Sequence, residues 1–325
     1  MNEAFDSSHD HSLKKSTMLI QLLKGGIGNQ FFQIAFATAL AKASKSNLAF
    51  DLRFFNHDGY NRKSILDKIF PDAKIIDTTH LPPESSAVLS EQVFFEFLGT
   101  NDMPRHYEFP GGISHIVLDG YWQDRRFVDT VNLASFRTTL EHHAKTVAPN
   151  WVTIINTSSQ SLAIHVRRHD YKHHGLCSEA YYIEAIHWLM AKYGTMDVFV
   201  YSDEPNYTSY FLNQSGIRHV LVNSGDDLAD LFLMSLCSYQ VISNSTFSWW
   251  GAMLSTAKRV IYPTPWSFMH TPSPWLCPSD WLGVNGAVEK HAVSRQDFGK
   301  TLDLEKFRVD KETSLELVFT ISPTR

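Results

Sequence analysis

The chain has 325 residues, 43% of them hydrophobic and 19% charged, which is the composition of a globular protein long enough for two domains. A formal net charge of −5 gives it no general affinity for nucleic acids or anionic lipids. Its three cysteines form no Cys-x-x-Cys pair, which predicts structural thiols in a reducing compartment. The polar residues 1–18 lack the features of a signal peptide, and no apolar run is long enough to span a bilayer. We therefore expect a cytoplasmic protein, with peripheral association at the inner membrane face as the alternative.

The first part of the chain has the pattern of a βαβ unit. It predicts, in order, a strand at 18–23, a glycine-rich turn at 25–30, a helix through 32–43 and a strand at 48–51. Such a unit forms a parallel sheet with a right-handed crossover. The segment 54–112 is irregular and interrupted by prolines, and residues 115–122 predict another strand that runs into an aromatic loop.

The second half of the chain alternates strands and helices more regularly. Period-two alternation predicts strands at 162–167, 197–202, 219–223, 240–243 and 259–262. Helical patterns lie between them, one closed by Gly194, one opened by Asp226 and one over 247–257. The sequence therefore predicts an α/β protein of two Rossmann-like domains, 18–155 and 156–285, with an unassigned extension at 286–325.

Charged and hydroxyl residues follow two predicted strands of the second domain. The strand in 'LAIHVRRHDY' leads into Arg167, Arg168 and Asp170, and 'VIS' leads into residues 244–246, which open a helix. Ligands of open parallel sheets bind at the carboxyl ends of the strands. A helix N-terminus binds phosphate through its N–H groups, and arginine supplies a full positive charge in a matching fork. Together these features predict a diphosphate site.

Two other interpretations of the motifs fit less well. Gly26 and Gly28 after a strand imitate a dinucleotide-binding fingerprint, but Phe31 occupies the place of its third small residue. Histidines recur at intervals of four from His165, but they fall on a strand and a loop rather than on one helix face that would hold a metal. Because the chain also lacks an Asp-x-Asp pair, we expect no metal at the diphosphate.

Seven segments resemble those of the α-1,2-fucosyltransferases of glycosyltransferase family 11. In chain order they are 'GGIGNQFFQIAFATALA', 'LDGYWQDRRF', 'IHVRRHDY', 'VYSDEP', 'DLFLMSLCSYQVISNSTFSWWGAML', 'VIYPTPW' and 'WLCPSDWLGV'. They extend over about residues 19–284, and the third and fifth are the most specific. His169 stands where the family usually has Gly, a residue that permits backbone angles His does not.

The resemblance implies a GT-B fold, with two domains facing across a cleft, and a metal-independent, inverting transfer. The donor would be GDP-fucose and the acceptor the 2-hydroxyl of a galactose-terminated glycan in surface polysaccharide or lipopolysaccharide. Arg167 would stabilise the charge of the leaving GDP, and His165, on the same side of the strand, would also reach the donor. Asp170 is the nearest carboxylate for the base that inversion needs, and Asp124 is the alternative.

The remaining candidate residues would bind donor or acceptor. We expect Arg168 to be mainly structural and Asp203, at the next strand end, to accept N–H bonds from guanine. The phosphate cradle is assigned to Asn244, Ser245 and Thr246, and the resemblance places Asn29 and Gln30 in the cleft, facing fucose or acceptor. Acceptor specificity is expected in the loops of 54–112, because binding residues concentrate in loops.

Two alternative functions stay open. One is a fucosyltransferase of another linkage, such as α-1,6, which shares the Arg-Arg type of motif. The other is a non-catalytic relative that binds a sugar or nucleotide. The full set of segments favours the α-1,2 linkage, and the arginines with the Ser/Thr run favour an enzyme, because a lectin would not need them.

Overall fold

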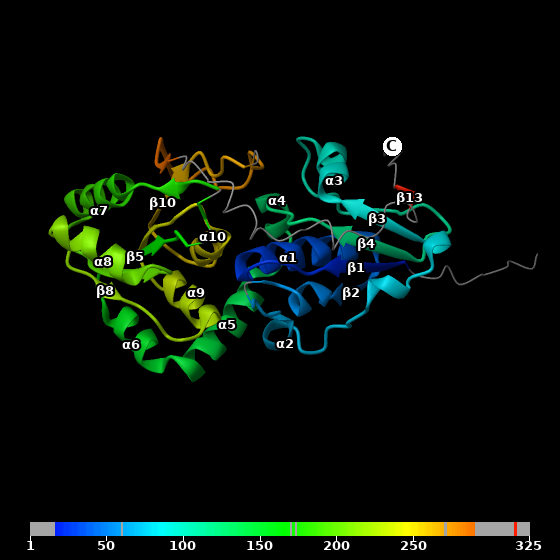
Figure 1. Cartoon of the computed structure of the whole chain (residues 1–325), viewed down its shortest axis with the longest axis horizontal. Helices are drawn as coiled ribbons and strands as arrows, with labels where there is room; N and C mark the ends of the chain where they lie inside the picture. The colour runs from blue at the N-terminus through cyan, green and yellow to red at the C-terminus, as the bar shows by residue number, and fades with distance from the viewer. Residues whose placement is uncertain are drawn as a thin grey trace, which may run out of the picture.

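The computed structural model describes residues 17–59, 61–169, 171–172, 174–269, 272–289 and 315–316, which form two parallel sheets covered by helices (Figure 1). The first sheet has the order β13-β3-β4-β1-β2 and consists of β1 (Met18–Leu22), β2 (Asn47–Asp51), β3 (Ser86–Ser90), β4 (His115–Asp119) and β13 (Leu315–Glu316). The second has the order β11-β10-β9-β5-β7-β8 and consists of β5 (Ser161–Val166), β7 (Asp197–Ser202), β8 (Val220–Leu221), β9 (Tyr239–Val241), β10 (Arg259–Thr264) and β11 (Leu282–Asn285). A separate antiparallel pair joins β6 (Leu176–Cys177) to β12 (Val288–Glu289). The predicted α/β class, with two parallel sheets covered by helices, is confirmed.

Helices connect the strands and cover the sheets. They are α1 (Ile27–Ser44), α2 (Leu66–Ile69), α3 (Glu91–Leu98), α4 (Arg125–Val128), α5 (Leu133–Val147), α6 (Pro149–Thr157), α7 (Glu179–Tyr193), α8 (Pro205–Gln214), α9 (Asp227–Ser235) and α10 (Thr246–Met253). Short 3-10 turns occur at Arg53–Asn56, Thr78–His80 and Pro83–Ser85. Among the described residues, no helix combines the length and the apolar character needed to cross a membrane.

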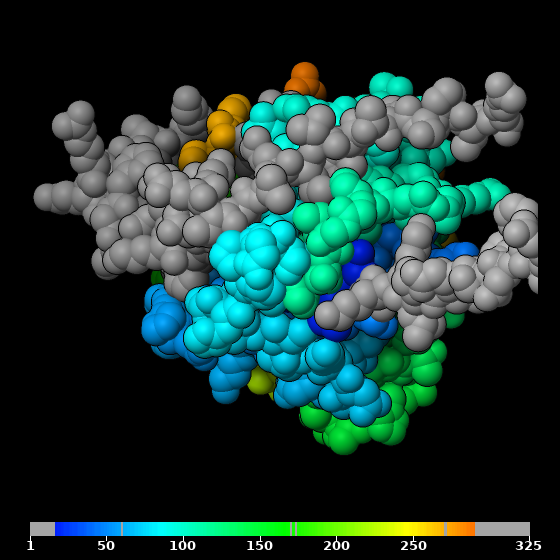
Figure 2. Space-filling model, turned by 90° about the vertical axis from the view of Figure 1, so that its right-hand side faces the viewer, coloured from blue at the N-terminus to red at the C-terminus, as the bar shows by residue number. Residues whose placement is uncertain are grey.

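The two parallel sheets contain three strands that the sequence pattern did not predict, and the β6–β12 pair was not predicted either. β3 lies within the segment 54–112, and β11 adds a sixth strand to the second sheet beyond the last predicted one. β13 comes from the unassigned extension and pairs with β3. Figure 2 looks onto the end of the molecule that carries the first sheet, where the described surface is mostly blue to cyan-green, the colours of the segment between β2 and β4.

Helix α1 is an internal helix. It begins at Ile27, inside the predicted turn 25–30, because Gly26 already takes the extended conformation of an N-cap residue. The predicted turn was therefore too long, and Gly28, Asn29 and Gln30 belong to the first helical turn. Of its 18 residues, 12 are buried, as expected for a helix that is covered on nearly all sides.

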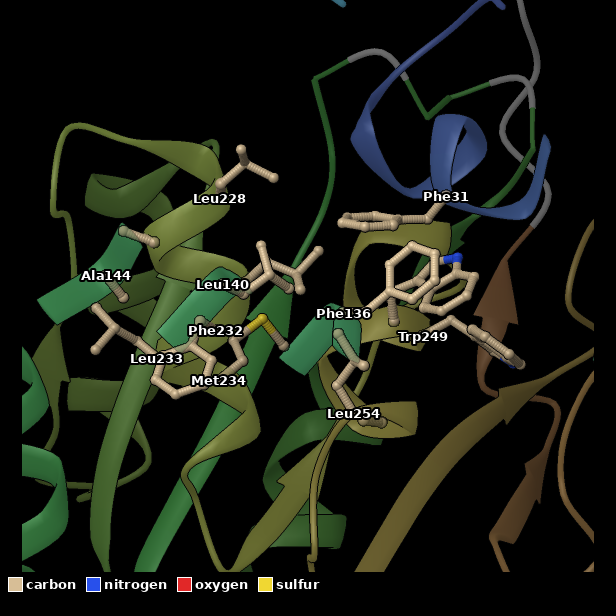
Figure 3. Close-up of a cluster of buried hydrophobic side chains, with 14 of the residues drawn as sticks. Phe31, Phe136, Leu140, Ala144, Leu228, Phe232, Leu233, Met234, Trp249 and Leu254 are labelled. Atoms are coloured by element: carbon tan, nitrogen blue, oxygen red, sulfur yellow. The ribbon is translucent and has the colours of Figure 1, made fainter. Parts of the chain in front are cut away.

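The parts built on the two sheets, here called the first and second domains, meet through aromatic side chains. Phe32 of α1 packs on Trp249 of α10 with ring centroids 4.5 Å apart, and Phe31 packs on Trp250 at 5.2 Å. Both tryptophans are fully buried. Phe136 of α5 belongs to the same cluster, which continues along α9 (Figure 3). One apolar core therefore extends from the first domain into the second.

The two domains approach each other closely at Gly28. A Cβ atom at this position would lie 2.3 Å from the carbonyl carbon of Thr246 and 2.5 Å from the backbone nitrogen of Phe247. Real Cβ atoms do not approach backbone this closely, so only glycine lets the first turn of α1 rest on the first turn of α10. A Cβ atom at Gly26, two residues earlier, would instead point into open space, with nothing within 4 Å.

Replacing Gly28 with alanine should force the two helix N-termini apart. Because the obstacle is backbone, we expect Gly28→Ala to lower the free energy of unfolding by about 1–3 kcal/mol or more. Gly26→Ala is the matched control and should cost less than about 1 kcal/mol, the loss from a poorer N-cap residue. Chemical denaturation measures both. Equal stability of the two variants would contradict the assignment of Gly28 as the interdomain contact.

Asp226 joins three separate parts of the chain. It is the N-cap of α9, where its carboxylate accepts from the backbone N–H of Ala229 at 2.9 Å. The same carboxylate pairs with Lys68 of α2 at 2.9 Å and with His143 of α5 at 2.8 Å. Burial favours the protonated form, but these three donors outweigh it and hold the pKa of Asp226 at about 2. Ionised Asp226 thus links the first domain, the connecting helix and the second domain.

The lowered pKa fixes the sign of a pH effect. The unfolded carboxylate is protonated first as the pH falls, so the contribution of Asp226 is complete above pH ~4 and disappears toward pH ~2. Asp226→Asn keeps a good N-cap and removes the charge, so it should cost about 1 kcal/mol or less at pH 7. Asp226→Ala also removes the cap and should cost roughly 1 kcal/mol more. Denaturation from pH 7 to 3 should show the gap between wild type and Asp226→Asn closing, and a gap that widens would contradict the ion-pair assignment.

Candidate active site

Arg167 stands at the carboxyl end of β5, beside the end of the neighbouring strand β7. Its Nε lies 3.2 Å from Oδ2 of Asp203, and 31% of its side chain is exposed. Asp203 also accepts the backbone N–H groups of Arg168 at 3.0 Å and His169 at 3.1 Å. The structure therefore places Asp203 beneath the loop that carries Arg167, where it fixes the loop and orients the guanidinium. The carboxylate oxygens of Asp203 that make these contacts are the ones expected from the sequence to accept N–H bonds from guanine.

Arg168 turns to the other side of the loop. Its Nε pairs with Oε2 of Glu204 at 3.1 Å, and its guanidinium lies 3.9 Å from the ring centroid of Tyr207. An arginine held by a carboxylate and an aromatic ring at once has little freedom to reach a ligand. The structural role expected for Arg168 therefore stays a prediction, and these contacts are what its substitution would remove.

His165 is buried inside the second domain, on the face of β5 that meets α10. Its Nδ1 lies 2.8 Å from Oγ of Ser243, and its ring packs on Phe247 with centroids 5.3 Å apart. Burial lowers its pKa to about 3, with the neighbouring Arg167 acting in the same direction. The ring is therefore neutral at physiological pH and is a weak base. What it supplies to the site is a fixed hydrogen bond to the end of β9.

The N-terminus of α10 faces the same region. Ser245 is the N-cap and accepts from the backbone N–H of Phe247 at 3.3 Å. Asn244 is buried and donates to the carbonyl of Gly175 at 3.0 Å, which anchors the loop before the helix. The first N–H groups of a helix have no partner within the helix, so this end attracts anions. Of the three cradle residues, Asn244 and Ser245 shape the backbone of the site.

Thr246 reaches across to the first domain. Its Oγ1 donates to Oδ1 of Asn29 at 3.0 Å, and Gln123 donates to the same oxygen at 3.0 Å. Gln30 is fully buried and bonds the Gly25 carbonyl and residues 63–65, so it braces the loop rather than facing outward. Of the pair expected to line the cleft, the structure brings Asn29 to the second domain and Gln30 to the first-domain interior.

The two carboxylates considered as the base differ in position. Asp124 is fully buried, and its oxygens accept from Arg126 at 2.8 Å and from Ser273 at 2.5 Å. It is bonded on both sides and cannot approach an acceptor hydroxyl without breaking these contacts. Asp170 lies outside the described residues. No cluster of three or more His, Cys, Asp or Glu side chains able to hold a metal occurs in the described part of the chain.

Three residues of the first domain were not singled out from the sequence. Lys24, just after β1, pairs with Asp119, the last residue of β4, at 2.6 Å. The ammonium of Lys24 lies 5.2 Å from the ring centroid of Tyr121. The rule that ligands bind at the carboxyl ends of parallel strands applies to this sheet as well. Had it been applied to β4, 'LDGY' would have marked Asp119 and Tyr121.

Similar sequences are found among glycosyltransferases. A sequence model described as glycosyl transferase family 11 matches residues 116–269. The chain is 27% identical to an α-1,2-colitosyltransferase of Escherichia coli, over 82% of this chain and 99% of the relative. It is 29% identical to the O-antigen biosynthesis glycosyltransferase WbnK of Escherichia coli, over 81% and 99% of the two chains. It is 24% identical to galactoside α-(1,2)-fucosyltransferase 2 of Sus scrofa, over 55% and 58%.

The matched region includes both β5 with its arginines and the N-terminus of α10, so the protein is a glycosyltransferase. The family whose model matches, glycosyl transferase family 11, is the family that the motifs led us to expect.

Proposed function

We propose that the protein transfers L-fucose from GDP-fucose to the 2-hydroxyl of a terminal galactoside, with inversion at the fucose carbon. The observation that carries the proposal is the placement of Arg167 and the α10 N-terminus at the carboxyl edge of one sheet. The α-1,2 linkage is supported by two relatives whose names specify it. A third relative is named for O-antigen biosynthesis, which supports a product in lipopolysaccharide or another surface glycan made on the cytoplasmic side.

In the proposed mechanism, the charge that develops on GDP is met by fixed groups. As the bond between fucose and the diphosphate breaks, negative charge grows on the phosphate oxygens. Arg167, oriented by Asp203, supplies positive charge, and the first N–H groups of α10 supply oriented dipoles. Because these groups are held in place beforehand, little reorganisation is needed when the charge appears. Asp203 acts on the diphosphate through Arg167, and a guanine contact would use oxygens that already accept from this loop.

The base and the metal are separate parts of the proposal. Asp170 keeps the role of general base, since Asp124 is bonded on both sides and His165 is a weak base. An inverting transfer needs only one such carboxylate on the acceptor side. We further propose that no metal is required, because arginine and a helix terminus together perform the charge neutralisation that a divalent cation performs elsewhere.

A second candidate donor is GDP-colitose. The observation that favours it is the relative named as an α-1,2-colitosyltransferase, which matches this chain over 82% of its length. Colitose differs from fucose only by lacking the 3-hydroxyl, so the diphosphate site and the linkage would be the same. The two donors therefore differ at one sugar hydroxyl and not in the chemistry of transfer.

A donor panel tests the proposed function. Purified protein should hydrolyse GDP-fucose or GDP-colitose in preference to GDP-mannose and UDP-galactose, and should transfer the sugar to a β-galactoside. Activity should persist in excess EDTA because no metal takes part. Hydrolysis of none of these donors would contradict the enzymatic proposal and favour a binding protein. Loss of transfer in EDTA that magnesium restores would contradict the metal-free scheme.

The two arginines should respond differently to substitution. Arg167→Ala should reduce turnover by 10²–10³, about 3–4 kcal/mol of transition-state stabilisation, and leave the melting temperature close to that of the wild type. Arg167→Lys should rescue poorly because lysine lacks the forked geometry. Arg168→Ala removes the contacts with Glu204 and Tyr207 and should mainly lower the melting temperature. Turnover and thermal unfolding of all three variants check this, and an inactive but stable Arg168→Ala beside an active Arg167→Ala would reverse the assignment.

A further inference from the structure

The polar side chains near the junction of the domains divide into two groups. In the first group, the hydrogen-bonding atoms of each side chain already bond to other protein groups. Glu91 accepts the backbone N–H groups of Tyr121 at 2.9 Å and Trp122 at 2.7 Å. Gln30 and Asp124 are likewise bonded on both ends. Such groups build the scaffold and have nothing left to offer a ligand.

A second group, at the carboxyl edge of the first sheet, keeps unused bonding positions. Within the described part of the chain, Oδ2 of Asp119 has no hydrogen-bond partner, since Lys24 occupies only Oδ1 at 2.6 Å. The ammonium of Lys24 has three N–H donors and uses one of them there. The phenol of Tyr121 also has no hydrogen-bond partner among the described residues. Burial raises its pKa to about 12, so the hydroxyl keeps its proton and can donate. All three side chains are partly exposed.

These groups lie next to the proposed donor site. A Cβ on Gly25 would be 3.3 Å from the Tyr121 ring and 2.9 Å from Nδ2 of Asn29, so both side chains border the turn that opens α1. Gln123, two residues after Tyr121, bonds Asn29, and Asn29 bonds Thr246 at the start of α10. The open polar group is therefore connected by direct contacts to the helix end where the diphosphate is proposed to bind.

We propose that Lys24, Asp119 and Tyr121 form the binding site for the terminal sugar of the acceptor, a neutral pyranoside with free hydroxyls. One carboxylate acceptor, spare ammonium donors and a phenol that both donates and accepts match the hydroxyls of a sugar ring, each of which is donor and acceptor. The Lys24–Asp119 pair balances its own charge, so the site favours a neutral sugar over an acidic one. The inference deepens the proposed function and rests on it.

Besides burial, four charged residues around Tyr121 affect the pKa of its phenol. Arg62 acts to lower this pKa, and Glu91, Asp119 and Asp58 act to raise it. Arg62 pairs with Asp58 at 3.5 Å in the segment 54–112, which was expected to carry acceptor specificity. That segment therefore borders the proposed sugar site, but the groups that bind the sugar come from the ends of β1 and β4.

Kinetics with two near-isosteric variants tests the inference. Asp119→Asn should raise the KM for a β-galactoside acceptor about tenfold or more, because a charged acceptor of hydrogen bonds is lost. Tyr121→Phe removes only the hydroxyl and should raise the same KM several-fold. Hydrolysis of GDP-fucose without acceptor, and the KM for the donor, should stay within about twofold of wild type in both. Asp67→Asn, at an exposed position of α2, is the control and should leave every constant unchanged.

Two results would overturn the inference: unchanged acceptor KM in both variants, or donor hydrolysis that falls in parallel with transfer. Saturation-transfer NMR can detect binding of methyl β-galactoside in the presence of GDP, and this measurement needs no turnover. Wild-type protein should show the signal, and Asp119→Asn should lose it. If wild type hydrolyses no nucleotide sugar, the proposed function fails, and this binding measurement then decides the sugar site on its own.

Discussion

The architecture depends on one backbone contact, the packing of Gly28 in α1 against the first turn of α10. Both helices begin at the carboxyl end of a parallel strand, so the contact brings the ligand-binding edges of the two sheets together. The aromatic pairs of Phe31 and Phe32 with the two tryptophans hold the rest of the helices at a matching distance. Because Gly28 has no side chain, the proposed diphosphate site at the start of α10 keeps a fixed position relative to the first domain.

On both sides of this contact, a carboxylate fixes the loop that carries a neighbouring candidate site residue. In the second domain Asp203 fixes the loop that presents Arg167, and in the first domain Glu91 fixes the loop that presents Tyr121. Each carboxylate accepts two consecutive backbone N–H groups just beyond a strand end. Charge-assisted bonds of this kind are strong and rigid, so the neighbouring side chain is presented in one orientation. Rigid presentation is what electrostatic catalysis and sugar recognition both require.

The sequence predicted what depends on local periodicity and on caps. The strands of the second sheet, the opening of α9 by Asp226 and the end of α7 at Gly194 follow from alternation and capping chemistry. β3 and β11 were missed because short strands among prolines and aromatics carry little alternation. The residues that contact Gly28, Asp203 and Asp124 could not be predicted from the sequence either. Each is set by a segment distant in sequence, and a carboxylate at a strand end looks the same in sequence whether it binds guanine or its own backbone.

The neutral state of His165 bears on the charge of the proposed diphosphate site. A charged imidazole buried next to Arg167 would add like-charge repulsion to a desolvation penalty, and its pKa of about 3 expresses that conflict. The neutral ring instead connects β5 to β9 through Ser243 and supports Phe247 at the start of α10. Positive charge is thus concentrated in a partly exposed guanidinium and in the helix dipole, two sources whose charge does not change between pH 5 and 8. The consequence is a site whose attraction for a diphosphate does not depend on the protonation of its nearest histidine.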